Sequence, residues 1–287
     1  MIMEEREIKA LISLLDDQDV QVSEHVENTI RHLGKSAIPF LEQAWESCLD
    51  PSVQRRIENL VHELQAVALR QRLTEWYGSE DRDLLTGMWI VATIQYPDLE
   101  LEKVRQSVEQ LYFEVWPEIP ADATPQDRIR TVNNFLFTKL RFGANTRNFH
   151  SPGNSMINIV MDTRRGNPIT LCVIYMLVAR KLKLPVFGVN LPNMFMLLYR
   201  DGSNEFYINA FNRGLVFTRK DLETYIQELH LNPRKEFFEP CSNEDIIRRA
   251  LRNLIVAFDK IGEHARAEEV KELLLLILDG GDLNITE

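Results

Sequence analysis

An apolar stretch near the middle of the chain constrains the fold more than any other feature. From Ile169 to Leu184 almost every residue is hydrophobic, and a helix that is apolar on all sides must be buried on all sides. Asn167 and Pro168 mark its start, because asparagine is a favoured N-cap residue and proline suits the first helical position. The stretch is too short to cross a bilayer, and Pro185 ends it. The sequence therefore predicts a central helix inside a larger core.

The residues after this helix predict a small antiparallel sheet. VFGVN, which starts at Val186, has the composition of a short buried strand. Apolar residues then alternate between two faces from Met194 to Tyr199. Residues 201–204 form a hairpin turn, and residues 205–211 form the return strand. We expect three or four strands in a meander, and we assign the methionine-rich strand to the core rather than to a binding surface.

Helical spacing dominates the rest of the chain. Residues 65–77 are expected to continue as helix, and residues 128–140 predict another amphipathic helix. Two capping boxes, Thr218 with Asp221 and Ser242 with Asp245, predict the starts of later helices. Residues 4–64 predict four consecutive helices, and positions 19–33 match positions 50–64 at a constant offset. This internal repeat resembles HEAT repeats, although a plain helical bundle is an equal alternative. Such helices provide either a surface for protein binding or a cap over the core.

Two further helices are expected at the C-terminal end. They cover residues 242–261 and 265–278, and the pair resembles a tetratricopeptide unit. The residues from Gly280 onward are expected to be loose. We therefore predict an α+β, mostly helical fold with a HEAT-like domain at residues 1–78, a core domain at 79–240 and a helix pair at 241–287.

Four ordered blocks of sequence carry a resemblance to a known family. They are FHSPGNSMINIVMDTRRG, RRGNPITL, KLKLPVFGVNLPNMF and FYINAF. Together they are similar to the SirB-type transglutaminase-like family over about residues 81–214. This resemblance implies a fold related to the papain-like cysteine hydrolases, with a buried central helix packed on a small antiparallel sheet.

The same resemblance implies where a catalytic triad would lie. Active members place a cysteine at the start of the central helix, where the helix dipole lowers the thiol pKa, and a histidine and an aspartate on neighbouring strands. These positions fall on Pro168, Met194 and Asn209. Proline cannot attack a carbonyl, methionine cannot move a proton, and asparagine carries no charge. We therefore expect that the fold is kept and that amide or acyl-transfer chemistry is lost.

A loop rich in asparagine, glycine and proline, residues 142–153, precedes the central helix and could hold a ligand or partner. Arg164 and Arg165 could attract an anion there or pair with an acid such as Asp162. A displaced catalytic pair, Cys172 with His150, is the enzymatic alternative, but Cys172 lies on an apolar face, where burial raises a thiol pKa. The candidate residues for a ligand or partner cleft are His150, Asn154, Arg164, Arg165, Asn167, Cys172, Asn193 and Tyr207.

Bulk properties narrow the remaining possibilities. The 287 residues carry a formal net charge of −10, which disfavours nucleic acid and anionic membranes as partners. The three cysteines have no disulfide or zinc spacing, and no phosphate-binding glycine loop or metal motif is present. We therefore expect no metal and no cofactor. The acidic N-terminal segment lacks the features of a signal peptide, which favours a reduced, cytoplasmic protein.

Three functional hypotheses follow. The first is a catalytically degenerate transglutaminase-like protein that binds a protein or peptide as a scaffold or regulator. The second is a residual cysteine hydrolase or acyl transferase that uses displaced residues. The third is a purely structural subunit. Neither the partner nor the oligomeric state can be inferred from the sequence.

Overall fold

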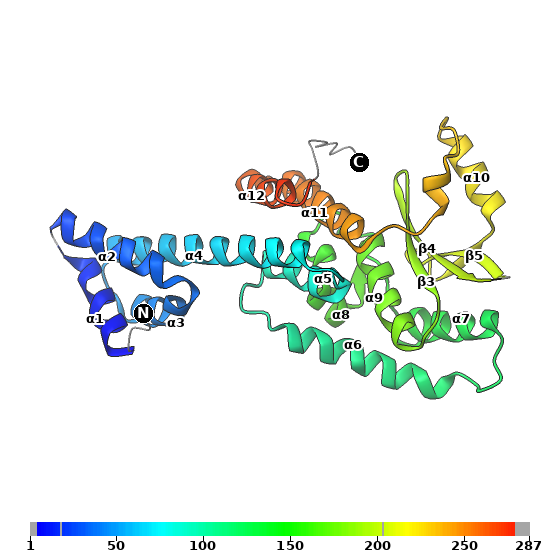
Figure 1. The fold of residues 1–287 in the computed structure, drawn as a ribbon, viewed down its shortest axis with the longest axis horizontal. Helices are drawn as coiled ribbons and strands as arrows, with labels where there is room; N and C mark the ends of the chain where they lie inside the picture. Colours follow the sequence, from blue (N-terminus) through cyan, green and yellow to red (C-terminus); the bar gives the residue numbers. More distant parts are fainter. Residues whose placement is uncertain (1–4, 18, 203, 279–287) are drawn as a thin grey trace. The chain divides into compact units, whose positions relative to one another are not determined.

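The computed structural model of the chain describes residues 5–17, 19–202 and 204–278. It has the predicted α+β, mostly helical fold (Figure 1). The chain forms two compact units, Met1–Arg72 and Leu73–Glu287. The finer division into three domains stays a prediction.

The first unit is helical and has its own apolar core. Its elements follow one another closely, with bounds α1 Glu5–Ser13, η1 Leu14–Asp16, α2 Val20–Leu33, η2 Gly34–Ala37, α3 Ile38–Ser47 and the start of α4, Pro51–Gly78. The four predicted helices are confirmed, and α4 also contains the predicted continuation beyond residue 64. Helix α4 ends within the second unit.

The second unit is built around α9 (Pro168–Lys181), whose residues from Ile169 to Ala179 are all buried. Helix α9 contacts strands β3 and β4 and four other helices. These helices are α5 (Leu84–Thr93), α6 (Leu101–Val115), α8 (Ile157–Thr163) and α11 (Asn243–Lys260). The predicted central helix is thus confirmed.

Helix α9 ends earlier than the sequence predicts, at Lys181 rather than near Leu184. Lys183 adopts a left-handed backbone conformation with φ of 57°. This turn lets the N–H of Leu184 donate to the carbonyl of Ala179 at 2.9 Å, which satisfies a carbonyl at the helix end. A proline at 185 also disfavours helical geometry in the residue before it.

The predicted meander is confirmed as a four-stranded antiparallel sheet in the order β3-β4-β5-β6. The strands are β3 Val186–Leu191, β4 Met194–Asp201, β5 Asn204–Asn209 and β6 Leu215–Phe217. Leu191 pairs with Met194 across one hairpin, and Asp201 pairs with Asn204 across the next.

The two faces of the sheet meet different helices, as the alternation of apolar residues predicts. Figure 1 shows α9 on one side of the sheet and α10 (Arg219–Glu228) on the other. On the α10 side, buried residues of the strands, α10 and the turn η6 (Lys235–Phe238) form one cluster, made of Val189, Leu191, Met196, Leu198, Tyr207, Leu222, Ile226 and Phe238. Met196 is fully buried, so its assignment to the core is confirmed.

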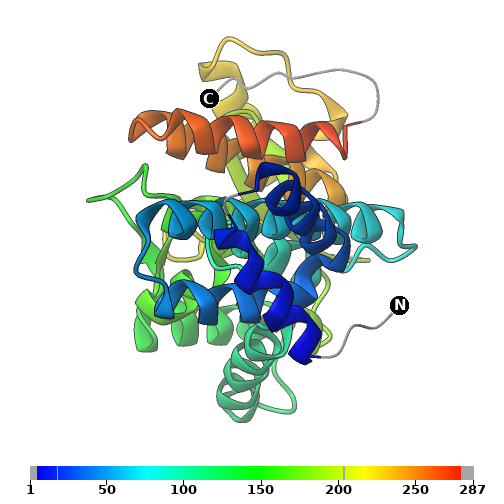
Figure 2. The ribbon, with the colours of Figure 1, turned by 90° about the vertical axis from the view of Figure 1, so that its left-hand side faces the viewer.

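The C-terminal helices α11 and α12 (His264–Leu275) lie side by side in both views (Figures 1 and 2). Both predicted capping boxes are present, one between Thr218 and Asp221 and one between Ser242 and Asp245. The segment from Gly280 onward, which the sequence predicts to be loose, lies outside the described residues.

Two predictions before the central helix need correction. The helix expected over residues 128–140 begins earlier, as α7 (Pro125–Asn133), and continues as a π-helical turn, η4 (Asn134–Lys139). The loop expected over residues 142–153 contains a short strand, β1 (Gly143–Ala144), which pairs in parallel with β2 (Arg165–Gly166). It ends in a 3-10 turn, η5 (Pro152–Ser155). Strands of two residues have no alternation that a sequence pattern could reveal.

Candidate functional site at the mouth of the central helix

Asn167 fixes the start of α9. Its Oδ1 accepts hydrogen bonds from the N–H and the hydroxyl of Thr170, at 2.9 and 3.1 Å. Its Nδ2 donates to Oγ of Ser155 at 2.9 Å, and its backbone N–H donates to the carbonyl of Asn154 at 3.3 Å. The first turn of the helix is therefore capped by a side chain that is itself held by the preceding segment.

Asn154 holds the loop in front of the helix. Its side chain is 3% exposed, and Nδ2 donates to the carbonyls of Asn148 and Phe149, both at 2.8 Å. Its Oδ1 accepts from Nδ2 of Asn145 at 2.8 Å. The backbone carbonyl of Asn154 also accepts the N–H of Asn167. Asn154 therefore links this loop to the start of α9.

Two of the three predicted triad positions are in contact. Nδ2 of Asn209, at the end of β5, lies 3.7 Å from Sδ of Met194, at the start of β4. Oδ1 of Asn209 accepts the backbone N–H of Asn212 at 3.0 Å. Met194 also packs against the cluster on the α10 face of the sheet. Neither side chain carries a charge or a proton that titrates near neutral pH.

Cys172 connects α9 to the same strand ends. It lies one helical turn beyond Pro168, and its thiol donates to the carbonyl of Phe195, with Sγ and O 3.7 Å apart. Burial raises the pKa of this thiol, and the backbone N–H of Ala210 offsets the rise only in part. Phe195 and Ala210 directly follow the two triad positions on the strands. The start of α9 therefore lies where β4 and β5 separate.

An aromatic surface lies beside these residues. Phe149 is 51% exposed, and its ring packs edge-on against His150 and Phe211, with centroids 5.2 and 6.3 Å away. Phe211 lies two residues beyond the end of β5. His150 is exposed whereas Cys172 is fully buried, an arrangement that does not favour the two as a base and its nucleophile.

Pairing with Asp162 was one predicted alternative for the two arginines before the helix, but among the described residues no ion pair joins either of them to Asp162. The guanidinium of Arg164 lies over the ring of Phe142, 4.6 Å from its centroid. Nη1 of Arg165 donates to its neighbour's carbonyl at 2.9 Å and also to the carbonyl of Arg141. Both contacts leave guanidinium donors available to an anion.

The other cleft candidates differ in exposure. Asn193 is exposed at the tip of the β3–β4 hairpin, with φ of 57°. Tyr207 is fully buried, and its hydroxyl donates to the carbonyl of Phe238 at 3.2 Å. Asn154, Asn167 and Cys172 therefore lie beneath the site, while His150, Arg164, Arg165 and Asn193 lie at or near its surface. Tyr207 belongs instead to the cluster on the α10 face of the sheet.

Sequence reasoning missed Arg249 on α11. Its Nη1 donates to the carbonyls of Leu191 and Met194, at 2.9 and 3.3 Å, and to the side-chain oxygen of Asn190. Burial lowers the pKa of this guanidinium. Arg249 is one of three arginines among the apolar residues of α11, so its position alone gave no signal, and its partners lie more than fifty residues away in sequence.

A comparison with protein families matches residues 102–252, which include every candidate residue above, to the transglutaminase-like superfamily. The chain belongs to this superfamily. The UPF0162 protein of Xylella fastidiosa (strain 9a5c) is 27% identical over 217 residues, which are 69% of this chain and 73% of the relative. F-box only protein 21 of Mus musculus is 26% identical over 156 residues, which are 52% of this chain and 24% of the relative. No solved structure matches the chain.

The superfamily match shows the scaffold and leaves its chemistry open. Among the described residues, no three His, Cys, Asp or Glu side chains gather where they could hold a metal ion. Likewise, no helix in residues 5–17, 19–202 or 204–278 is both long and apolar enough to span a membrane.

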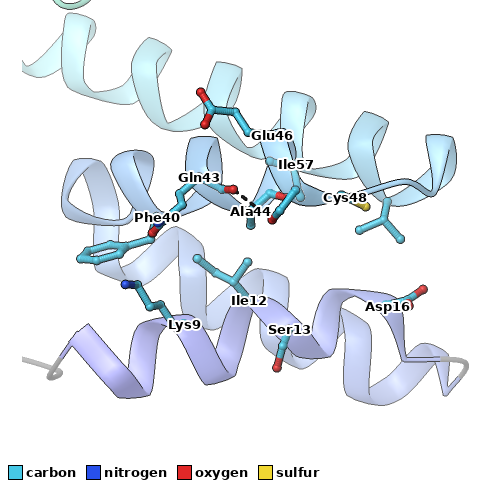
Figure 3. A pocket seen from close by; sticks show the side chains of 12 residues that line it. Lys9, Ile12, Ser13, Asp16, Phe40, Gln43, Ala44, Glu46, Cys48 and Ile57 are labelled. Carbon is cyan, nitrogen blue, oxygen red and sulfur yellow. Dashed lines mark hydrogen bonds between the residues drawn. The ribbon is translucent and has the colours of Figure 1, made fainter.

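A separate open groove lies within the first unit (Figure 3). Helices α1 and α3 and the start of α4 line it, and its volume is about 740 Å³. Its apolar side chains include Ile12, Phe40 and Ile57, while Lys9 and Asp16 lie toward its rim. Cys48, a half-buried thiol, also lines it. This groove lies outside the residues matched to the superfamily.

Proposed function

We propose that this chain is a catalytically degenerate transglutaminase-like protein that binds a segment of another protein at the mouth of α9. The contact between Met194 and Asn209 carries this proposal. It occupies the position where the SirB-type resemblance places a histidine and its orienting acid, and neither side chain can take that role.

The residue at the third triad position, Pro168, also supports a loss of catalysis. Pro168 is the first residue of α9, where a cysteine would gain a lowered pKa from the helix dipole. A proline there has no nucleophilic atom. The nearest thiol along the helix, Cys172, is buried and its pKa is raised, so it is a poor nucleophile at neutral pH.

Binding is favoured over a purely structural role because hydrogen bonds within the protein hold the exposed surface at the start of α9 in place. Asn154 and Asn167 use buried hydrogen bonds to hold the loop and the helix start in place. That loop presents Phe149, an exposed aromatic side chain of the kind enriched in protein interfaces. A loop tied down this well can bind a partner without a large ordering cost.

The flanking helices extend the proposal. The HEAT-like character of residues 1–78 and the tetratricopeptide-like character of the pair at 241–287 would make both segments additional surfaces for protein contacts. A cytoplasmic location and the absence of nucleic-acid partners belong to the same proposal and follow from composition.

A peptide-display library selected against the full chain tests the binding function. We expect enriched peptides whose affinity falls about tenfold in Phe149→Ser, because a central aromatic contact is worth about 1–2 kcal/mol. Phe113→Ser is the matched control, since Phe113 is also an exposed phenylalanine, on α6, and is 62% exposed. A library without enriched sequences, or equal losses in both variants, would contradict the proposal.

Site-resolved alkylation with iodoacetamide separates binding from the residual cysteine hydrolase. In the folded wild-type chain we expect Cys172 to remain unmodified at neutral pH and to react only after unfolding. Rapid labelling of Cys172 that His150→Ala abolishes would instead establish the displaced catalytic pair.

A further inference from the structure

The stretch around the loop and the start of α9 is basic in an acidic protein. From Lys139 to Asn167 the chain carries five lysines and arginines but a single acid, Asp162, while the net charge of the whole chain is −10. Lys139 is paired with Glu118, with Nζ and Oε2 2.6 Å apart. We call the four remaining cations the arginine surface; they are Arg141, Arg147, Arg164 and Arg165.

The parallel pairing of β1 with β2 brings the two halves of the arginine surface together. Gly143 is opposite Arg165 in this ladder, and its N–H donates to the carbonyl of Arg164 at 3.0 Å. The N–H of Asn145 donates to the carbonyl of Gly166 at 3.2 Å, which places the start of the loop that carries Arg147 beside the same ladder. Residues more than twenty positions apart thus form one local group.

Two of the four guanidinium groups are held in place by uncharged partners. Arg165 donates to two backbone carbonyls, and Arg164 stacks over the ring of Phe142. A guanidinium carries five N–H donors, so each contact leaves donors for a second ligand. Holding the side chains beforehand reduces the entropy lost when an anion binds.

None of the four arginines has a carboxylate partner within the part of the chain that the structure describes. Arg141, Arg147 and Arg165 are exposed, and Arg164 is half-buried. Other arginines of the second unit, such as Arg105 and Arg130, do pair with acids on their own helices. No carboxylate of the described residues therefore neutralises the positive charge of the arginine surface.

We propose that the arginine surface binds an acidic segment of a protein partner, with an apolar side chain of that segment placed against Phe149. This inference rests on the proposed peptide-binding function and names the chemical class of the peptide. Guanidinium groups recognise carboxylates through paired hydrogen bonds. Phe211, which follows β5, contacts Phe149 and adds an apolar ring beside it.

A peptide is favoured over nucleic acid by the charge of the rest of the molecule. A net charge of −10 repels a polyanion that extends beyond the local surface, whereas a short acidic segment can remain within it. Tighter binding of nucleic acid than of an acidic peptide would therefore overturn the proposal.

Fluorescence anisotropy with the full chain provides the test. The probe is a labelled peptide in which glutamates surround one phenylalanine, and its control has every glutamate replaced by glutamine. We expect the glutamate peptide to bind at least about tenfold more tightly, and the difference to shrink when salt rises from about 50 to about 300 mM, because screening weakens exposed charge pairs.

Charge reversal locates the binding. Arg147→Glu removes no hydrogen bond or ion pair found in the described structure, and we expect it to weaken the glutamate peptide about fivefold or more. Arg105→Glu changes the net charge equally on α6 and is expected to leave binding within about twofold. The double variant Arg147→Glu/Arg164→Glu should lose more than either single change.

The outcomes separate this inference from the function on which it rests. If display selection enriches peptides but glutamate and glutamine probes bind equally, the acidic assignment is overturned while peptide binding stands. Equal effects of Arg147→Glu and Arg105→Glu would also overturn it. So would a single-stranded RNA that displaces the glutamate peptide and binds more tightly than it.

Discussion

Asn209 donates an amide N–H to the thioether of Met194, with Nδ2 and Sδ 3.7 Å apart. The two residues are fifteen positions apart and lie on neighbouring strands, β4 and β5. A sulfur atom is a weak acceptor, so this contact adds little energy. Its importance is its place, since the family resemblance puts a charged and titrating pair at the same two positions. The proposed loss of catalysis therefore rests on this uncharged pair.

Removing the Asn154 side chain should loosen the mouth of α9. Asn154→Ala deletes three partly buried side-chain hydrogen bonds and leaves the carbonyls of Asn148 and Phe149 without that donor. We expect a loss of about 2–4 kcal/mol in the free energy of unfolding, measured by urea denaturation. Asn148→Ala is the control, because it truncates an exposed side chain, and it should change stability by less than about 0.5 kcal/mol. Similar losses in both variants would contradict this account of the loop.

The stability of the chain should fall in alkaline solution. Burial raises the pKa of the Cys172 thiol, and it raises the pKa of Cys241 to about 12, from an ordinary value of 9.0. Below pH 9.0 both thiols are protonated in the folded and the unfolded chain, so the full stability is present. Above it the unfolded chain releases these protons while the folded chain retains them, and stability declines until the folded pKa is reached.

Each thiol should contribute about 1 kcal/mol of this loss between about pH 9 and pH 10. Urea unfolding at both pH values measures the loss. Cys172→Ala should make the decline less steep, even though the cavity lowers stability at every pH. Cys241→Ala should also make the decline less steep, because burial raises the pKa of that thiol as well. An unchanged slope in Cys172→Ala would show that this thiol titrates normally.

Arg249 should stabilise the hairpin that carries Met194. Arg249→Met keeps a long side chain but removes the donors to the carbonyls of Leu191 and Met194. Hydrogen bonds to a charged group contribute about 1.5–3 kcal/mol, so we expect a loss of about that size. Arg219→Met on α10 removes an exposed ion pair with Glu223 and should cost less than about 1 kcal/mol. The account of the hairpin would be wrong if the two variants lost equal stability.

The local parts of the fold could be predicted because their causes are local. Asn167 and Pro168 set the start of α9, and the capping boxes at Thr218 and Ser242 set the starts of α10 and α11. Alternating apolar residues from Met194 onward predicted a strand buried on both faces. Each signal involves residues within one or two turns of the element it defines.

The rest depended on contacts between distant segments. The β1–β2 ladder pairs only two residues with two others, so it has no alternation of apolar and polar residues. Arg249 lies on α11, whereas the carbonyl of Leu191 that it binds lies in the β3–β4 hairpin. The early end of α9 depends on the left-handed conformation of Lys183, which lysine rarely prefers. For the candidate site, the meeting of Met194 with Asn209 was predicted by the family resemblance and not by spacing.

The central claim of the proposed function is that a transglutaminase-like scaffold keeps its geometry while inert side chains stand at the positions of a reactive triad. The variant Pro168→Cys/Met194→His/Asn209→Asp rebuilds the expected triad and tests this claim directly. The measurement is the site-resolved rate of alkylation of the new cysteine at about pH 6, compared with Pro168→Cys alone. We predict a rate at least about tenfold higher in the triple variant, because a neighbouring imidazolium lowers a thiol pKa. Equal rates in two variants with native circular dichroism would contradict the claim.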